Sequence, residues 1–208
     1  AGRSGSACAP HALCDKIYYC GKDYPEFGGK KLFGGKGAKF SFLKEYEEQL
    51  SAWCNSEFGH AKARAVLAYV RSHSLVSDLV KEKILHLGTS GKLLTKWDSE
   101  AETPDIFRLL TAKNGEREQG DAFIRWHVRE DNNPCTAVWE DASLQNAWQE
   151  FDASTKELKG VCMVTGNSDA ALAVIHPKRI RHAGDGARLI SANDSSGYTF
   201  RGRFTDDT

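Results

Sequence analysis

The chain has 208 residues, of which 40% are hydrophobic and 10% aromatic, enough for a buried core in one domain with or without a subdomain. Its formal net charge is zero, and no apolar run approaches the about 20 residues of a membrane-spanning helix. The first ten residues, AGRSGSACAP, lack the apolar stretch of a secretory signal. These features favour a globular, cytoplasmic protein and predict no contact with a membrane.

Charge is unevenly distributed along the chain. Residues 1–44 carry eight Lys or Arg against three acids, whereas residues 45–160 carry fourteen against twenty. Residues 172–203 again carry six basic residues against Asp185 and Asp194. Two basic ends around an acidic middle indicate a polyanionic partner on one face, although solvated lysines on loops explain many single clusters.

The first predicted elements are a short helix at 12–20 and a glycine-rich loop at 21–40. The loop holds Lys30, Lys31 and Lys36 among aromatic side chains, a mixture that can contact phosphates and stack on bases. A mobile, solvated loop is the equally good alternative. The loop is not a P-loop, because no Gly-Lys-Ser/Thr follows at the required spacing.

Three helices are predicted next, at 41–55, 59–72 and 77–86. In the first, apolar residues recur at spacings of three and four, with glutamates on the other side. In the third, Ser77 or Asp78 is the predicted cap, and Leu79, Val80 and Ile84 are predicted to pack.

The pattern then changes to short apolar runs. Ile106–Leu110 and Phe123–Val128 are predicted to form a β-hairpin, with Ile124, Trp126 and Val128 on one face and Arg125, His127 and Arg129 on the other. A helix capped by Asp141 follows, packing Leu144, Trp148 and Phe151. Strands are predicted at 160–165, 170–176 and 187–192. This order predicts an α+β fold, with a mixed or antiparallel sheet and several packed helices.

The six cysteines suit a reducing compartment better than a disulfide framework, because the chain is long and rich in core residues. Cys54 and Cys162 lie among apolar neighbours and are predicted to be buried thiols. Cys8, His11, Cys14 and Cys20 lie close in sequence but lack the paired spacing of a zinc site, so ordinary thiols are favoured and zinc is the alternative. No metal or other cofactor is predicted.

No catalytic group stands out. Cys162 and His176 could form a thiol–imidazole pair, but no third orienting group or oxyanion feature accompanies them. Asp206 and Asp207 are adjacent carboxylates at a chain end, which are usually solvated. We therefore expect no enzymatic activity.

Five ordered motifs occur in the last part of the chain: Cys162 to Gly166, His176-Pro177-Lys178, Gly184-Asp185-Gly186, Ile190 to Asn193, and Phe200-Arg201-Gly202. Upstream, LCDKIYYCGKD occupies residues 13–23. Together they resemble the large subunit of the type I-C CRISPR Cascade, the crRNA-guided interference complex. Two positions depart from that family's pattern: Lys16 stands where Asn is usual, and Ala192 replaces Phe, so stacking at 192 is not expected.

The resemblance implies that residues 1–208 are the N-terminal, DNA-sensing globular part of that subunit, helical over about 12–100 and β-rich over about 104–203. The family's opening strands would precede residue 1, and its C-terminal helical bundle would follow residue 208. The implied role is to recognise the protospacer-adjacent motif (PAM) in target double-stranded DNA, for antiviral defence. The implied partners are that DNA, the crRNA-bound backbone and handle-binding subunits, the helicase–nuclease recruited after target binding, and phage anti-CRISPR proteins.

Asn and basic residues near strand ends are the predicted DNA contacts. Asn167 and Asn193 could bond base edges, and a larger set of cations suits phosphates: Lys178, Arg179, Arg181, Arg188, Arg201 and Arg203, with Lys30, Lys31 and Lys36 of the earlier loop. As an alternative, Gly166 and Asn167 only form a hairpin turn. Two other functions remain open: an assembly module that docks the crRNA handle and neighbouring subunits without touching DNA, and a zinc-stabilised nucleic-acid module.

Overall fold

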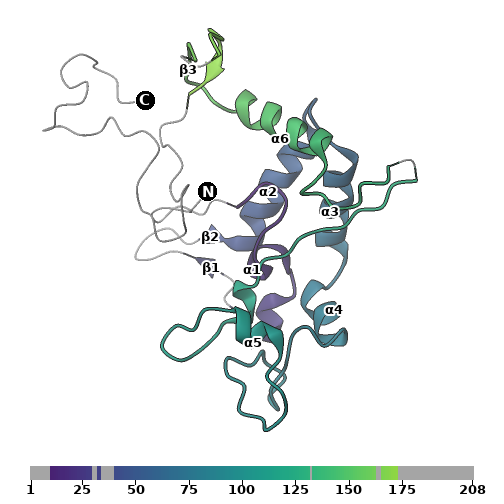
Figure 1. The fold of residues 1–208 in the computed structure, drawn as a ribbon, viewed down its shortest axis with the longest axis vertical. Coiled ribbons are helices and arrows are strands. Elements are labelled where there is room, and N and C mark those ends of the chain that lie inside the picture. The colour runs from purple at the N-terminus through teal and green to yellow at the C-terminus, as the bar shows by residue number, and fades with distance from the viewer. Residues whose placement is uncertain (1–9, 30–31, 34–39, 132, 163–164, 173–208) are drawn as a thin grey trace, which may run out of the picture. The chain divides into compact units, whose positions relative to one another are not determined.

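The computed structural model describes residues 10–29, 32–33, 40–131, 133–162 and 165–172 (Figure 1). Its helices are α1 (Ile17–Cys20), α2 (Phe42–Asn55), α3 (Ala61–Ser72), α4 (Leu75–Lys81), α5 (Asp105–Leu109) and α6 (Ala142–Ser154), with 3-10 turns η1 (Tyr24–Phe27) and η2 (Gln119–Asp121). Its strands are β1 (Leu32–Phe33), β2 (Phe40–Ser41), β3 (Lys159–Gly160) and β4 (Ala170–Ala171). They form two antiparallel pairs, β1–β2 and β3–β4. The predicted α+β class is confirmed.

The described residues fall into two compact units, and the boundary lies inside α6. One unit ends at Trp148 and contains α1 to α5, and the other begins at Gln149 and contains β3 and β4. The predicted division into a helical and a β-rich part stays a prediction.

Helices α2 and α3 confirm the sequence patterns at 41–55 and 59–72, because their caps are local. The Ser41 hydroxyl accepts a hydrogen bond from Lys44 N (3.3 Å), and His60 Nδ1 accepts one from Lys62 N (3.2 Å). The helices pack through apolar side chains that are almost fully buried: Tyr46, Leu50, Trp53, Ala63, Val66 and Val70.

Segment 13–23 is the centre of the larger unit. The Leu13 carbonyl accepts hydrogen bonds from Tyr46 Oη (2.5 Å) and Trp126 Nε1 (3.1 Å). Ile17 N donates to Ala122 O (3.0 Å), so the segment lies beside residues 122–124. Every second residue from Leu13 to Tyr19 is buried, and Cys20 and Asp23 are buried as well. Only the last turn of the predicted 12–20 helix forms, as α1.

Helix α4 differs from the predicted helix at 77–86 at both ends. Its first amides are capped from far away in sequence: Asp23 accepts from Val76 N (3.1 Å) and Ser77 N (2.9 Å). It ends early because Lys83 adopts a left-handed φ of 58°. Lys83 N then donates to Val80 O (3.0 Å) and Ile84 N to Leu79 O (2.9 Å), the Schellman pattern.

The early end of α4 turns Ile84 outward. The prediction that Ile84 packs is wrong, since it is 50% exposed, whereas Leu85 is 1% exposed. Leu85 joins Ile17, Tyr24 and Val76 in a core cluster, against which Leu79 and Val80 pack as predicted.

The predicted hairpin between 106–110 and 123–128 is wrong. Residues 105–109 form α5, which buries Phe107. Residues 126–128 instead pair with 136–138, where Val128 N donates to Thr136 O (2.8 Å) and Val138 N to Trp126 O (3.2 Å). The predicted alternation is confirmed, because Arg125, His127 and Arg129 are exposed and the residues between them are half-buried.

Helix α6 confirms the prediction at its start and on its apolar side. Asp141 accepts hydrogen bonds from Ser143 N (3.0 Å) and Leu144 N (3.3 Å), and Leu144 and Phe151 are buried. Among the described residues, β3 (Lys159–Gly160) and β4 (Ala170–Ala171) form at the starts of the predicted strands 160–165 and 170–176. Residues 163–164 and 173–176 of these predicted strands lie outside the described residues. The predicted strand 187–192 lies outside the described residues.

The prediction that Cys54 and Cys162 are buried is confirmed for one of the two. Cys54 is buried as predicted, and burial raises the pKa of its thiol, whereas Cys162 is only half-buried. No disulfide joins the described cysteines. In the described part of the chain, no helix is long and apolar enough to cross a membrane.

Candidate nucleic-acid interface

The best-defined predicted contact is the turn between β3 and β4. Gly166 adopts a φ of +74°, and its N–H donates to Cys162 O (2.8 Å). Cys162 N donates in turn to Asn167 O (2.8 Å), which closes the turn. A left-handed φ favours glycine, so the Thr-Gly-Asn sequence explains the sharp reversal here.

Asn167 stabilises this turn and also remains available to a ligand. Its Oδ1 accepts a hydrogen bond from Asp169 N (3.0 Å), so the turn interpretation of Gly166 and Asn167 fits the structure. The side chain is exposed, and its Nδ2 donates to no described residue. Asn167 can therefore donate a hydrogen bond outward from a fixed backbone.

The positive charge of Lys159, beside the turn, is neutralised by an acid. Lys159 Nζ lies 3.0 Å from Asp169 Oδ2, across the β3–β4 pair. The positive charge that DNA binding needs must come from other residues. All ten other predicted contacts lie outside the described residues: Lys30, Lys31, Lys36, Lys178, Arg179, Arg181, Arg188, Asn193, Arg201 and Arg203. His176 of the rejected thiol–imidazole pair lies there too.

The candidate ligands of the alternative zinc site are only partly described. Cys8 lies outside the described residues, while His11 packs edge-on to Phe123, with 5.8 Å between ring centroids. Burial raises the pKa of the Cys14 and Cys20 thiols, which disfavours the thiolate form that binds zinc. Among the described side chains, no group of three or more His, Cys, Asp or Glu could hold a metal ion.

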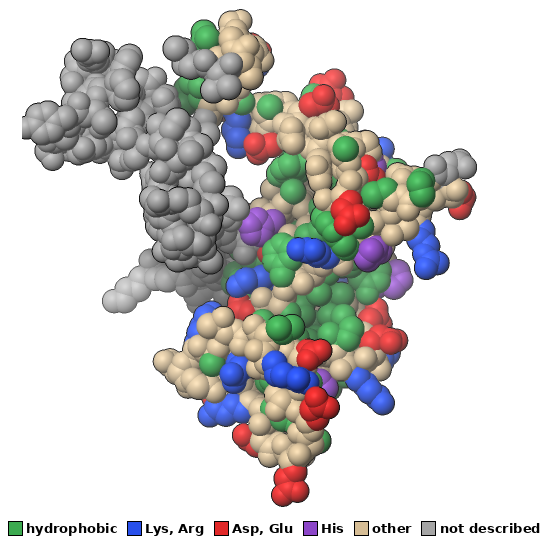
Figure 2. Space-filling model, in the orientation of Figure 1, with side chains coloured by type: hydrophobic (Ala, Val, Ile, Leu, Met, Phe, Trp, Pro, Cys, Tyr) green, Lys and Arg blue, Asp and Glu red, His purple; other side chains and the backbone are tan. Residues whose placement is uncertain are grey.

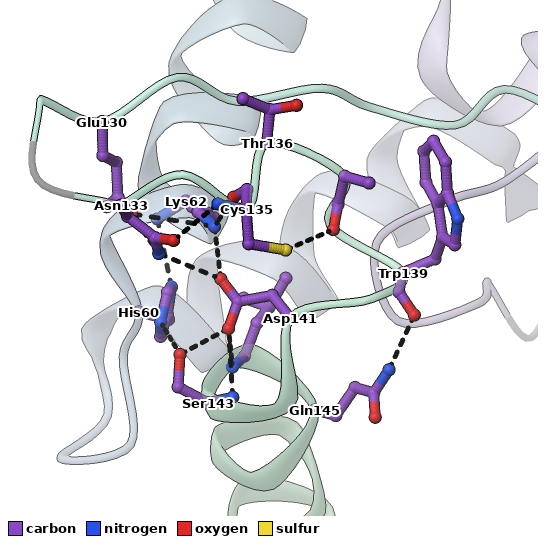
Figure 3. Close-up of polar contacts among 12 residues, drawn as sticks. His60, Lys62, Glu130, Asn133, Cys135, Thr136, Trp139, Asp141, Ser143 and Gln145 are labelled. Carbon is purple, nitrogen blue, oxygen red and sulfur yellow. Dashed lines mark hydrogen bonds and ion pairs between the residues drawn. The ribbon is translucent and has the colours of Figure 1, made fainter.

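A buried ion pair holds the start of α6 to α3 (Figure 3). The Lys62 side chain is 0% exposed, and its ammonium contacts the carboxylate of Asp141, which is 6% exposed. Lys62 Nζ also donates to Cys135 O (2.5 Å) and lies 3.8 Å from Glu130 Oε2. Asn133 Nδ2 donates to Glu130 Oε2 (3.1 Å) and so closes the network.

Each member of the pair keeps the other charged. Burial, the largest single influence, would lower the pKa of Lys62, but the hydrogen bond to Asp141 and the nearby charges of Asp141 and Glu130 together outweigh it, so the pKa is raised. Hydrogen bonds from Lys62 and Ser143 lower the pKa of Asp141 well below its usual range. The network is thus structural: it fixes the N-terminus of the helix that leads to the β3–β4 pair.

A comparison with protein families identifies the family of the chain. A family model described as CRISPR-associated protein (Cas_Csd1) matches residues 1–208. The chain belongs to this family. Among curated proteins and among solved structures, no match to the chain was found. Membership in Cas_Csd1 supports a role as a CRISPR-associated subunit of Cascade, which suggests that the chain partners other Cascade subunits and crRNA.

In this Cas_Csd1 chain, the family-like segment 13–23 builds the core. Asp15 is fully buried and accepts hydrogen bonds from His11 N (2.8 Å) and Lys16 N (2.7 Å). Lys16 forms an ion pair with Asp121 at 2.6 Å. Segment 13–23 therefore contributes buried hydrogen bonds and an ion pair to the core of the larger unit.

Sequence reasoning missed Lys62, although a signal was present. Lys62, Val66 and Val70 are spaced by four, so Lys62 lies on the buried side of α3. A lysine on an apolar helical stripe needs a buried acid, and Asp141 is that acid.

Proposed function

We propose that this Cas_Csd1 chain is the DNA-contacting part of the large subunit of a type I-C Cascade. It recognises the PAM on intact target duplex and performs no chemistry on the DNA. The observation that carries the proposal is the family match along the whole chain, which supports a Cascade subunit. PAM recognition needs a few base contacts and many phosphate contacts before the guide pairs with its target.

Asn167 is the proposed base-reading residue among those described. Its side chain is exposed, and the Nδ2 donor can bond an acceptor atom on a base edge in the major groove, such as N7 of a purine. Arg179 and Arg181, with the other basic residues of 178–203, are the proposed phosphate contacts, as their composition suggests. The proposed setting is the cytoplasm, beside the crRNA-bound backbone and handle-binding subunits and a recruited helicase–nuclease.

The test is binding of PAM duplex to the assembled complex. Arg179→Ala with Arg181→Ala should weaken binding and reduce the slope of log K against log salt by about 2, since each phosphate contact contributes about 0.9. Lys81→Ala with Lys83→Ala removes two exposed charges elsewhere and is the matched control. Unchanged affinity and slope in the arginine variant would remove these residues from the interface.

An assembly role without DNA contact is the second candidate, and one observation favours it. Leu158 and Val161 flank β3 and are 51% and 57% exposed, so the same hairpin offers apolar surface to a protein. If this role is correct, Leu158→Ser with Val161→Ser lowers incorporation into the complex, while Asn167→Ala leaves DNA binding unchanged.

A further inference from the structure

Residues 126–130 pair with 133–138, and together with residues 123–125 before them they carry an outward face of alternate exposed side chains. They project from the helices as a ribbon whose strands are joined through the bridge of His127 to Ala137 (Figure 1). Successive residues of a strand point to opposite sides. Phe123, Arg125, His127 and Arg129 are all exposed on one side, and Phe123 is 50% exposed.

This face combines cations with aromatic rings. The Arg125 guanidinium lies over the Trp139 ring, 5.1 Å from its centroid. His127 packs edge-on against the same indole at 4.9 Å and contacts Thr136 Oγ1 at 3.0 Å. Because Trp139 already orients Arg125 and His127, a ligand would lose less side-chain freedom on binding them.

The positive charges of this face are not neutralised by described acids. Arg125 and Arg129 form no ion pair with another described residue, and no acid occurs between Asp121 and Glu130. Of the acids that follow in sequence, Glu130 faces Lys62, whereas Glu140 accepts a hydrogen bond from Trp139 Nε1 (3.1 Å) and so lies beside this face. Asp131, at the turn, is the exposed acid beside Arg129. The two arginines of this face thus form no ion pair with described residues, although carboxylates lie nearby; Figure 2 shows basic and acidic side chains interspersed over the described surface in that view.

We propose that this face, Phe123, Arg125, His127 and Arg129 with Trp139, binds an unpaired strand of nucleic acid. Alternating cations and rings suit an unpaired strand, since arginines meet phosphates and rings stack on exposed bases. In a duplex the faces of the bases are stacked on one another, so a duplex would contact only the arginines of this face and not its rings. The site is separate in sequence from the basic residues of 178–203, so it does not depend on their role at the PAM.

The test uses the full chain and short fluorescein-labelled oligothymidine and oligouridine, with a duplex for comparison. Arg125→Gln with Arg129→Gln should weaken single-strand binding about tenfold and lower the salt slope by about 1.4, at about 0.7 per contact. The control variant Lys44→Gln with Lys83→Gln removes the same amount of charge from exposed sites elsewhere. It should bind the single strands more tightly than the arginine variant does. Phe123→Leu should weaken binding to the oligonucleotides more than to the duplex.

Each result decides the proposal. Thermal unfolding at the wild-type temperature shows that the variants are folded. Preference for oligothymidine identifies DNA as the source of the strand, and preference for oligouridine identifies RNA. Equal losses in the arginine and lysine variants, or wild-type protein that binds the duplex but neither oligonucleotide, would overturn it. Arg179→Ala with Arg181→Ala should not change the single-strand result, which separates this site from the proposed PAM contacts.

Discussion

Replacing Lys62 by Met removes one charge from the buried network while keeping a chain of similar length. The ammonium loses its hydrogen bond to Cys135 O, its pairing with Asp141 and its attraction to Glu130. Asp141 keeps hydrogen bonds from Ser143 N and Leu144 N, but its charge stays buried.

The size of the effect follows from this burial. Removing one partner of a buried ion pair costs about 3–5 kcal/mol, because the other charge is left uncompensated. Because Asp141 keeps these two hydrogen bonds, the expected loss is at the lower end of that range, about 3 kcal/mol. In a chain of this length, such a loss lowers the melting temperature by about 6–12 °C. The double variant Lys62→Met/Asp141→Asn should lose less than the sum of the single variants, because both charges are gone.

Urea unfolding followed by circular dichroism and tryptophan fluorescence measures this loss. The matched control is Lys44→Met, which breaks the pair of Lys44 with Glu48, whose side chains are 71% and 62% exposed. An exposed pair of this kind contributes about 0.5 kcal/mol or less. A loss below about 1 kcal/mol in Lys62→Met, similar to the control, would refute the structural role of the buried pair.

Three further outcomes are expected from unfolding experiments. The lowered pKa of Asp141 stabilises the fold at neutral pH, and this contribution is lost as pH falls below about 4. The raised pKa of Lys62 gives stability that is lost as pH rises above about 10. Between about pH 5 and pH 3, the Lys62→Met variant should therefore lose less stability than the wild-type protein, and an equal loss would contradict this. Gly120→Ala should cost about 1–3 kcal/mol in urea unfolding, because a Cβ there would lie closer than 3.0 Å to the buried Tyr24 ring; no change would show that the ring can move. Lys83→Gly should raise the melting temperature, with a gain of about 0.5–1 kcal/mol, because glycine adopts the observed φ of 58° without strain; a lower melting temperature would argue against the left-handed end of α4.

The helices that could be predicted are those whose signals are local. α2 and α6 have a capping Ser41 or Asp141 directly before their apolar periodicity, and both formed at the predicted places. α4 begins two residues earlier than predicted because its cap, Asp23, lies 53 residues before Val76. Its end was missed because a lysine, and not the usual glycine, adopts the left-handed conformation.

Short apolar runs were the least predictable part of the fold. Ile106 to Leu110 could be a strand or one helical turn by its pattern alone, and the buried Phe107 decides for α5. The strand pattern at 123–129 gave the correct inward and outward faces, but its partners were missed. Lys16 is distant in sequence from Phe123, and Ala137, ten residues after His127, lies in a run that was not predicted as a strand. Of the candidate site, the tight turn at Gly166 was predictable from glycine chemistry, whereas the buried Lys62 pairs with an acid 79 residues away.

The most direct test of the account is photo-crosslinking from position 167 in the assembled complex. Asn167→p-benzoylphenylalanine places a reactive group at the exposed turn between β3 and β4. We predict a crosslink to duplex DNA that requires the PAM. A crosslink only to a neighbouring protein subunit, with or without PAM-bearing DNA, would contradict a role in reading DNA.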